Sequence, residues 1–232
     1  MIVIAIIAII AAIAVPNLLA AKLSANETAA IATLRSIVSS QAQVSTVGKI
    51  DADGDGRGEF GTFLELTGTV GVRRGYTPGT PASSDFSVQG PPLNPAVLSS
   101  VLARIDANGY VTKAGYAFIL FLPDAAVPAG FVHETGPSTT PGLTGGTGSV
   151  GVDLSEDYWC VYAHPVMLGN SGNRRFFATQ RGDLLQSPND VAKFQGTTAV
   201  PPGNSAYRGT GISSSLAVGT VGNDGDVWKA TN

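Results

Sequence analysis

The sequence predicts an α+β protein in which a long N-terminal helix packs on an antiparallel β-sheet head with long loops. Three observations predict this class. The first 21 residues carry no charged side chain, a helical apolar pattern continues to about residue 47, and short aromatic-rich runs between Gly and Pro breaks follow. The chain therefore divides into an apolar half-helix at 1–22, an amphipathic half-helix at 23–47, and a globular β-rich head at 48–232 that ends in a polar tail.

The composition fits one exported, loop-rich domain behind the helix. Of the 232 residues, roughly 180 remain after a helix of about 50, which suits one domain with its own core. Charged residues make up 13% and the net charge is -3 without a basic patch, so nothing in the composition supports nucleic-acid binding. A single cysteine, Cys160, rules out an internal disulfide. Packing, hydrogen bonds or a metal must therefore stabilise the C-terminal region.

The apolar run at the N-terminus is long enough to cross a bilayer, which needs about 20 residues. A helix that is apolar on every side must be buried in lipid or among other helices. A cleaved secretory signal would have a basic start and a core of about 7–15 apolar residues, and this run has no basic start. The run is therefore predicted to be a membrane anchor or the buried core of an assembly.

The second half of the helix has a different pattern. Pro16 removes a backbone hydrogen bond, so we expect a kink or local melting there. Beyond it, Ile31, Leu34 and Val38 recur at helical spacing, while polar residues such as Arg35 fall mostly elsewhere. The second half therefore presents one face to the head, and the first half protrudes.

The residues of this helix carry a family resemblance. Met1-Ile-Val-Ile-Ala-Ile-Ile-Ala-Ile-Ile-Ala-Ala-Ile-Ala-Val-Pro16-Asn17, continued without a gap through Val38, resembles the N-terminal helix of type IV pilins and type II secretion pseudopilins. The resemblance covers roughly the first 45 residues and implies a major pilin, a homopolymeric subunit of an extracellular filament on the cell surface. It implies roles in adhesion, surface motility or DNA uptake, and an inner-membrane pool before assembly. A pilus assembly ATPase, a platform protein and a prepilin peptidase are the implied partners.

The same resemblance concerns the start of the chain. In that family the apolar run follows Gly-Phe-Thr-Leu-Ile-Glu-Leu, where a prepilin peptidase cuts after the Gly and the new N-terminus is methylated. This chain starts at Met1, inside the motif, so we expect an incomplete N-terminus. The resemblance places these residues in the core of a filament: Ile2, Ile4, Ile7, Ile10, Ile13, Pro16 and Leu19.

Two other functions remain open. A type II secretion pseudopilin would share the helix, but its major form usually has a shorter head with an Asp-Pro-Trp-Gly-like motif, which this sequence lacks. The other alternative is an extracytoplasmic binding module that is tethered by a single membrane span and stays monomeric.

The head has two groups of expected elements. The first comprises a short helix or turn at 60–66, irregular chain at 67–93, and a helix from Pro95 to Arg104 capped by Asn94. The second comprises three strands, for which aromatic and β-branched enrichment gives the ranges 116–122, 158–163 and 175–180. The third is followed by an Arg-Gly-Asp turn and then by Leu-Leu-Gln at 184–186. A long loop at 124–157 separates the first two strands. The tail at 187–232 is expected to pack through Trp228 as an edge strand. The strands look like those of pilin heads, more loosely than the helix does.

An acidic loop after the helix is the best candidate for a metal site. Asp51, Asp53, Asp55 and Glu59 have the spacing of the first, third, fifth and ninth positions of an EF-hand loop, and such oxygens suit Ca²⁺. Thr62 stands where the bidentate Glu belongs, so the loop is at most EF-like. The alternative is a solvated acidic turn. A second stretch, 223–226, has a weaker pattern of the same kind.

No set of residues points to catalysis, so the chain is expected not to be an enzyme. Cys160 and His164 could pair as nucleophile and base, but a small apolar cysteine in a core is far commoner. His133 is expected alone in a loop. The Gly-rich run at 142–151 lacks the Lys-Ser/Thr ending of a phosphate loop and is expected to be a flexible surface loop.

Overall fold

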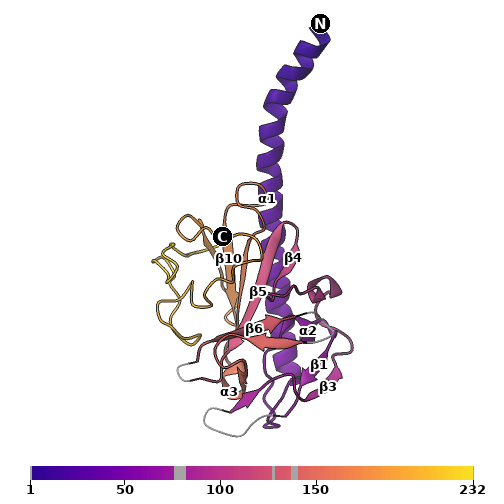
Figure 1. Ribbon diagram of the computed structural model, residues 1–232, viewed down its shortest axis with the longest axis vertical. Coiled ribbons are helices and arrows are strands. Elements are labelled where there is room, and N and C mark those ends of the chain that lie inside the picture. Colours follow the sequence, from indigo (N-terminus) through magenta and orange to yellow (C-terminus); the bar gives the residue numbers. More distant parts are fainter. Residues whose placement is uncertain (1, 76–81, 127–128, 137–140, 232) are drawn as a thin grey trace.

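A computed structural model describes residues 2–75, 82–126, 129–136 and 141–231. The helix α1 (Ile2–Val47) is 46 residues long, about 70 Å at the usual rise per residue. Its first half projects from the head, and its second half lies along the head (Figure 1). The regular structure of the remaining chain is mainly antiparallel strand, joined by long irregular segments, so the predicted α+β class is confirmed.

The helix is continuous through Pro16, so the predicted local melting there is wrong. A proline removes one N–H donor, and the hydrogen bonds of the turns on either side keep the helix together. The protruding half bends gently away from the axis of the other half (Figure 1).

The head is built on one large antiparallel sheet. Its strand order is β12-β11-β10-β9-β5-β6-β7, with β4 paired to β5. The strands are β4 (Val111–Lys113), β5 (Tyr116–Pro123), β6 (Phe131–Thr135), β7 (Gly142–Thr144), β9 (Cys160–Pro165), β10 (Arg175–Thr179), β11 (Leu184–Ser187) and β12 (Lys229–Ala230). The central strands β5 and β9 pair over six residues, with Ile119 opposite Tyr162.

Both faces of this sheet are buried. On one face Phe118 belongs to the core that includes Leu34 and Ile37 of α1. On the other face Ile119 and the C-terminal tail share a second core, to which Trp228 belongs. Successive side chains of a strand point to opposite faces, so a strand covered on both sides reads as a continuous apolar run. This explains why every residue of β5 is buried.

The tail behaves as the sequence predicts. Trp228 is fully buried, and β12 pairs with the edge of the sheet through Leu185 opposite Ala230. Before β12 the tail is irregular, and isolated β-bridges such as the one between Val218 and Trp228 join its segments to one another.

Several predictions for the smaller elements are wrong. Residues 67–93, predicted irregular, contain β1 (Gly71–Arg73), β2 (Ser83–Ser84) and β3 (Gln89–Pro92), although 76–81 lie outside the described residues. The predicted helix at 95–104 is only a 3-10 turn, η1 (Ser100–Ala103), because Ser99 rather than Asn94 accepts a hydrogen bond from the first turn. The short helix predicted at 60–66 is present as α2 (Phe63–Leu66), with Thr62 as its cap.

The predicted loop at 124–157 also contains regular structure. It contributes β6 and β7 to the large sheet, and it forms β8 (Val150–Gly151) and α3 (Val152–Ser155). The Gly-rich run 142–151 is therefore strand at both ends rather than one flexible loop. Asp124 explains part of this order, because its carboxylate accepts hydrogen bonds from the backbone N–H and hydroxyl of Thr147. Residues 127–128 and 137–140 of the predicted loop lie outside the described part of the chain.

Candidate assembly surface

The protruding half of α1 exposes a long apolar surface. Every residue from 2 to 22 is exposed, and Glu27 is the first buried residue in the part of the chain that the structure describes. The large apolar side chains of this half are between 41% and 78% exposed: Ile2, Val3, Ile4, Ile6, Ile7, Ile9, Ile10, Ile13, Val15, Leu18 and Leu19. Six of the seven predicted filament-core residues are among them, and the seventh, Pro16, is also exposed.

These side chains surround the helix instead of forming one stripe. The most apolar stretch of 18 residues has a mean hydropathy of 2.9 and no buried residue, and α1 is the one helix in the described ranges that is long and apolar enough to span a membrane. Each Å² of apolar surface removed from water contributes roughly 25 cal/mol. A helix that is apolar all round therefore requires lipid or other helices on every side.

A polar clasp fixes the point where α1 leaves the head; we call this point the neck. Glu27 accepts hydrogen bonds from Arg174 Nε at 2.8 Å and Nη2 at 2.6 Å, and from the backbone N–H of Asn173 at 3.1 Å. One residue earlier on the helix, Asn26 Nδ2 donates a hydrogen bond to the Ser171 carbonyl at 2.8 Å. The clasp sets the direction in which the apolar half projects.

Two glycines allow close contacts between neighbouring segments at the neck. A Cβ on Gly115, where φ is +75°, would lie 3.0 Å from both Asn26 Nδ2 and the Ser171 side chain. A Cβ on Gly172 would overlap the Tyr116 hydroxyl. The clasp is not predicted from the sequence, although Glu27, as the first acidic residue after a long uncharged run, is a signal that a partner is needed there.

Replacing Glu27 by Gln should loosen the neck. Gln keeps the size of the side chain but lacks the charge that Arg174 binds. Because Arg174 is 45% exposed, solvent screens the ion pair, and we expect the free energy of unfolding to fall by only about 1–2 kcal/mol. Urea unfolding of the full chain in detergent measures this. Arg35→Gln on the exposed side of the same helix is the control and should change stability by less than about 0.5 kcal/mol. Equal stability of E27Q and R35Q would contradict a structural role for the clasp.

The acidic loop brings together three of its four predicted ligands. Asp51, Asp53 and Asp55 each offer an oxygen, and these oxygens lie within 4.8 Å of one another. Asp51 Oδ1 also accepts a hydrogen bond from the Gly54 N–H at 2.7 Å, as expected of a turn. Burial, together with the carboxylates of Asp55 and Asp51, raises the pKa of Asp53.

The predicted fourth ligand, Glu59, does not join this group. Its side chain is buried, where Oε1 accepts from the Ala52 N–H at 2.7 Å and Oε2 accepts from the Ser155 hydroxyl at 3.0 Å. Glu59 therefore fixes the base of the loop.

Calcium binding by the three aspartates stays a prediction. With three carboxylates and no bidentate Glu, we expect weak binding, with Kd on the order of 10⁻⁴–10⁻³ M. Isothermal titration of the full chain in detergent should give heat with Ca²⁺, and Asp53→Asn should weaken binding by about tenfold or more. Asp183→Asn, an exposed acid far from the loop in the sequence, should leave Kd unchanged. The absence of both binding heat and a shift in the unfolding temperature at millimolar Ca²⁺ would contradict the calcium hypothesis.

The cysteine and the histidines are core residues. Cys160 is fully buried, and burial raises the pKa of its thiol far above the ordinary value. His164 Nε2 lies 2.7 Å from the Gly196 carbonyl, and burial lowers the pKa of its imidazole to about 4. His133, predicted in a loop, lies instead on β6, where its Nδ1 is 2.9 Å from the carbonyl oxygen of Glu134.

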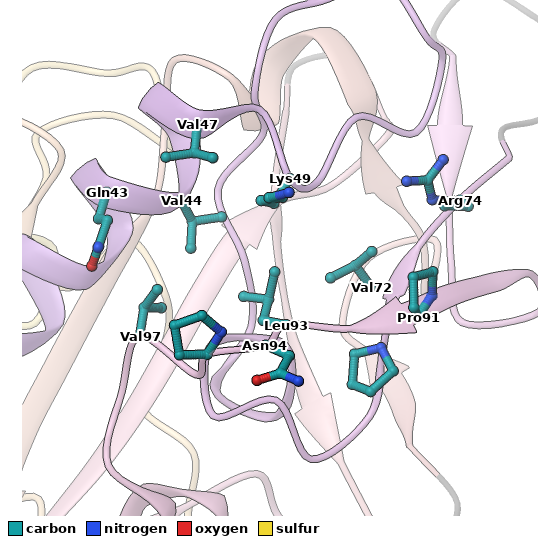
Figure 2. Close-up of a pocket in the computed structure, with 12 residues that line it drawn as sticks. Gln43, Val44, Val47, Lys49, Val72, Arg74, Pro91, Leu93, Asn94 and Val97 are labelled. Atoms are coloured by element: carbon teal, nitrogen blue, oxygen red, sulfur yellow. The ribbon is translucent and has the colours of Figure 1, made fainter.

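A groove of about 340 Å³ lies between the end of α1 and the β1–β3 pair (Figure 2). Its lining is mostly aliphatic and proline: Gln43, Val44, Val47, Lys49, Val72, Arg74, Pro91, Pro92, Leu93, Asn94, Pro95 and Val97. Val44 and Val72 are almost fully buried. No acidic, cysteine or histidine side chain is among these described lining residues. The groove therefore has the chemistry of a recess for an apolar group, with the cations Lys49 and Arg74 in its lining.

Comparison with known proteins gives no match to a family model, to a curated protein or to a solved structure.

Proposed function

We propose that the chain is a structural subunit, of the major pilin type, of an extracellular helical filament that polymerises through the apolar half of α1. One observation carries the proposal. A half-helix that is apolar on every side and has no charged residue over 2–21 extends from a head that buries one face of the other half. Such a helix has to exchange water for lipid or for other helices, and a filament core supplies the latter.

The geometry supports a two-step pathway. Before assembly, the apolar half sits in the inner membrane as a single span, and its length matches the bilayer. During assembly, subunits leave the lipid and pack these halves into a central bundle. Apolar surface stays buried in both states, so close packing rather than hydrophobic transfer sets the order of the bundle. An assembly ATPase, a platform protein and a prepilin peptidase are the proposed partners.

The rigid attachment of α1 supports the role of the head. The clasp at Glu27 and the core around Leu34 fix the head to the helix, so a bundle of helices would display the heads outward in a regular array. The outward loops and strand ends would then provide contacts for adhesion or motility. Calcium in the acidic loop would stabilise one such outward segment.

Electron microscopy of material sheared from the cells that make this chain tests the proposal. We expect long filaments that bind an antibody against the head. A chain recovered only from membranes, with no filament bound by the antibody, would contradict the proposal and favour the single-span tether. Short periplasmic assemblies without surface filaments would favour the pseudopilin alternative.

A further inference from the structure

Three carboxylates and one guanidinium are buried together between α2, β1 and β6. Arg73 and Glu65 are fully buried, and Glu59 and Glu134 are 1% and 3% exposed. Glu59, Glu65 and Arg73 come from the single segment 59–75, and Glu134 alone lies on the large sheet. We call them the carboxylate cluster.

Arg73 neutralises only part of this charge. Its Nε lies 3.1 Å from Glu65 Oε1, and its Nη2 donates to the Phe60 carbonyl at 2.8 Å. Glu59 is farther away, with Oε2 at 3.7 Å from Nη2. With one cation and three acids, the cluster would hold two excess negative charges if every carboxyl were ionised, and buried unpaired charge is costly.

Glu134 is the member of the cluster without an ionic partner. Its two oxygens accept hydrogen bonds from the backbone N–H groups of Phe63 at 2.9 Å and Leu64 at 3.1 Å. Acidic Glu65 faces it from α2, and its neighbour on β6 is His133, whose pKa is lowered by burial. Arg73, on β1, is the cation of the cluster, but its contacts are with Glu65 and Glu59. On the flanking strands, Leu143 of β7 pairs with Glu134, and Phe121 of β5 pairs with His133.

We propose that the side chain of Glu134 is protonated in the folded head. Loss of this proton loosens the segment 59–75, which contains α2 and β1. Burial, opposed by the hydrogen bonds, raises the pKa of Glu134 to about 8. A carboxyl whose pKa is raised on folding contributes stability that is complete below its unfolded value, near 4.5, and that is lost as the pH rises through about 8. The segment is therefore held most firmly in acid and weakens in alkali.

The segment 59–75 shares the apolar core with α1, and one side chain of the helix also holds it by hydrogen bonds. Gln41 of α1 donates from Nε2 to the Gly61 carbonyl at 2.7 Å, and its Oε1 accepts from the Gly61 N–H at 2.9 Å. The segment 59–75 is thus attached to the buried end of α1. This device belongs to the head alone and holds whether or not the chain assembles.

Hydrogen exchange of the full chain in detergent between pH 6 and pH 8 tests the proposal. After correction for intrinsic exchange, opening of 59–75 should increase by roughly tenfold per pH unit. Infrared spectra should show the C=O stretch of a protonated carboxyl at pH 6 that disappears by pH 9. Glu134→Gln should remove the pH dependence of exchange in 59–75 and the Glu134 part of the infrared signal.

Glu156→Gln is the matched control, because burial also raises the pKa of Glu156, to about 7, and Arg57 partly opposes this. In E156Q the pH dependence of 59–75 and the Glu134 part of the infrared signal should remain. The proposal fails if exchange in 59–75 is independent of pH, or if E156Q removes the whole infrared signal. If E134Q does not fold, the wild-type exchange profile and the E156Q spectrum still decide the question.

Discussion

Ile10→Asp should abolish surface filaments. Ile10 lies near the centre of the apolar half and is 61% exposed in the isolated subunit, so lipid or neighbouring helices must surround it. An aspartate at the centre of a membrane helix costs about 2.5–3.5 kcal/mol, which corresponds to a loss of roughly 100-fold in the inserted or assembled fraction. Quantitative immunoblotting of the sheared fraction against total cellular chain measures the loss.

Ile10→Leu is the matched control, since it keeps an apolar side chain of the same size and should assemble within about twofold of the wild type. The head of the Asp variant should stay folded, because Ile10 contacts no part of the head. Normal filament yield from Ile10→Asp would show that the apolar half does not form the core of an assembly.

Trp228→Ala should destabilise the head by about 3–5 kcal/mol. Trp228 is fully buried in the second core, 6.0 Å from the Tyr162 ring and 5.8 Å from the Phe177 ring. The Arg175 guanidinium lies 5.2 Å from its ring centroid, so the substitution also removes a cation–π contact. Urea unfolding of the full chain in detergent, followed by the fluorescence of buried Trp159, measures the change.

Val221→Ala is the control for the tail. Val221 lies in the same irregular segment but is 57% exposed, so its truncation should cost less than about 0.5 kcal/mol. If W228A were as stable as V221A, the tail would not be an essential cover of the sheet. The second face of the sheet would then require another explanation for its continuous apolar strands.

The sequence predicts the long helix and the central strands well. The strong apolar character of 1–22 and the aromatic runs of β5, β9 and β10 are local signals, and they locate these elements to within about two residues. The burial of Trp228 could also be predicted, because a large aromatic side chain in a polar tail is expected to pack against the rest of the domain. These features depend on side chains close together in the chain.

The features that the sequence did not predict depend on distant partners. Glu134 accepts from Phe63 across 71 positions, and Glu27 binds Arg174 across 147. Spacing along the chain contains no trace of such contacts. The same limit explains Glu59, whose spacing fits an ion loop while its actual partner, Ser155, comes from another part of the head.

Short strands were also hidden from sequence reading. A strand such as β1 or β2, with two or three residues, is too brief to show an alternating pattern, and its partner fixes its position. The helix predicted after Asn94 is absent. The Ser99 hydroxyl, five residues later, caps the short 3-10 turn that forms instead.

Helical reconstruction of the sheared fraction by cryo-electron microscopy tests the central claim most directly. The proposed function predicts a filament whose axis is a bundle of the 2–22 half-helices, with a β-sheet head attached at Glu27 on the outside of each. A filament whose core is built from other chains, or a chain that is found only as dispersed membrane-bound monomers, would contradict it.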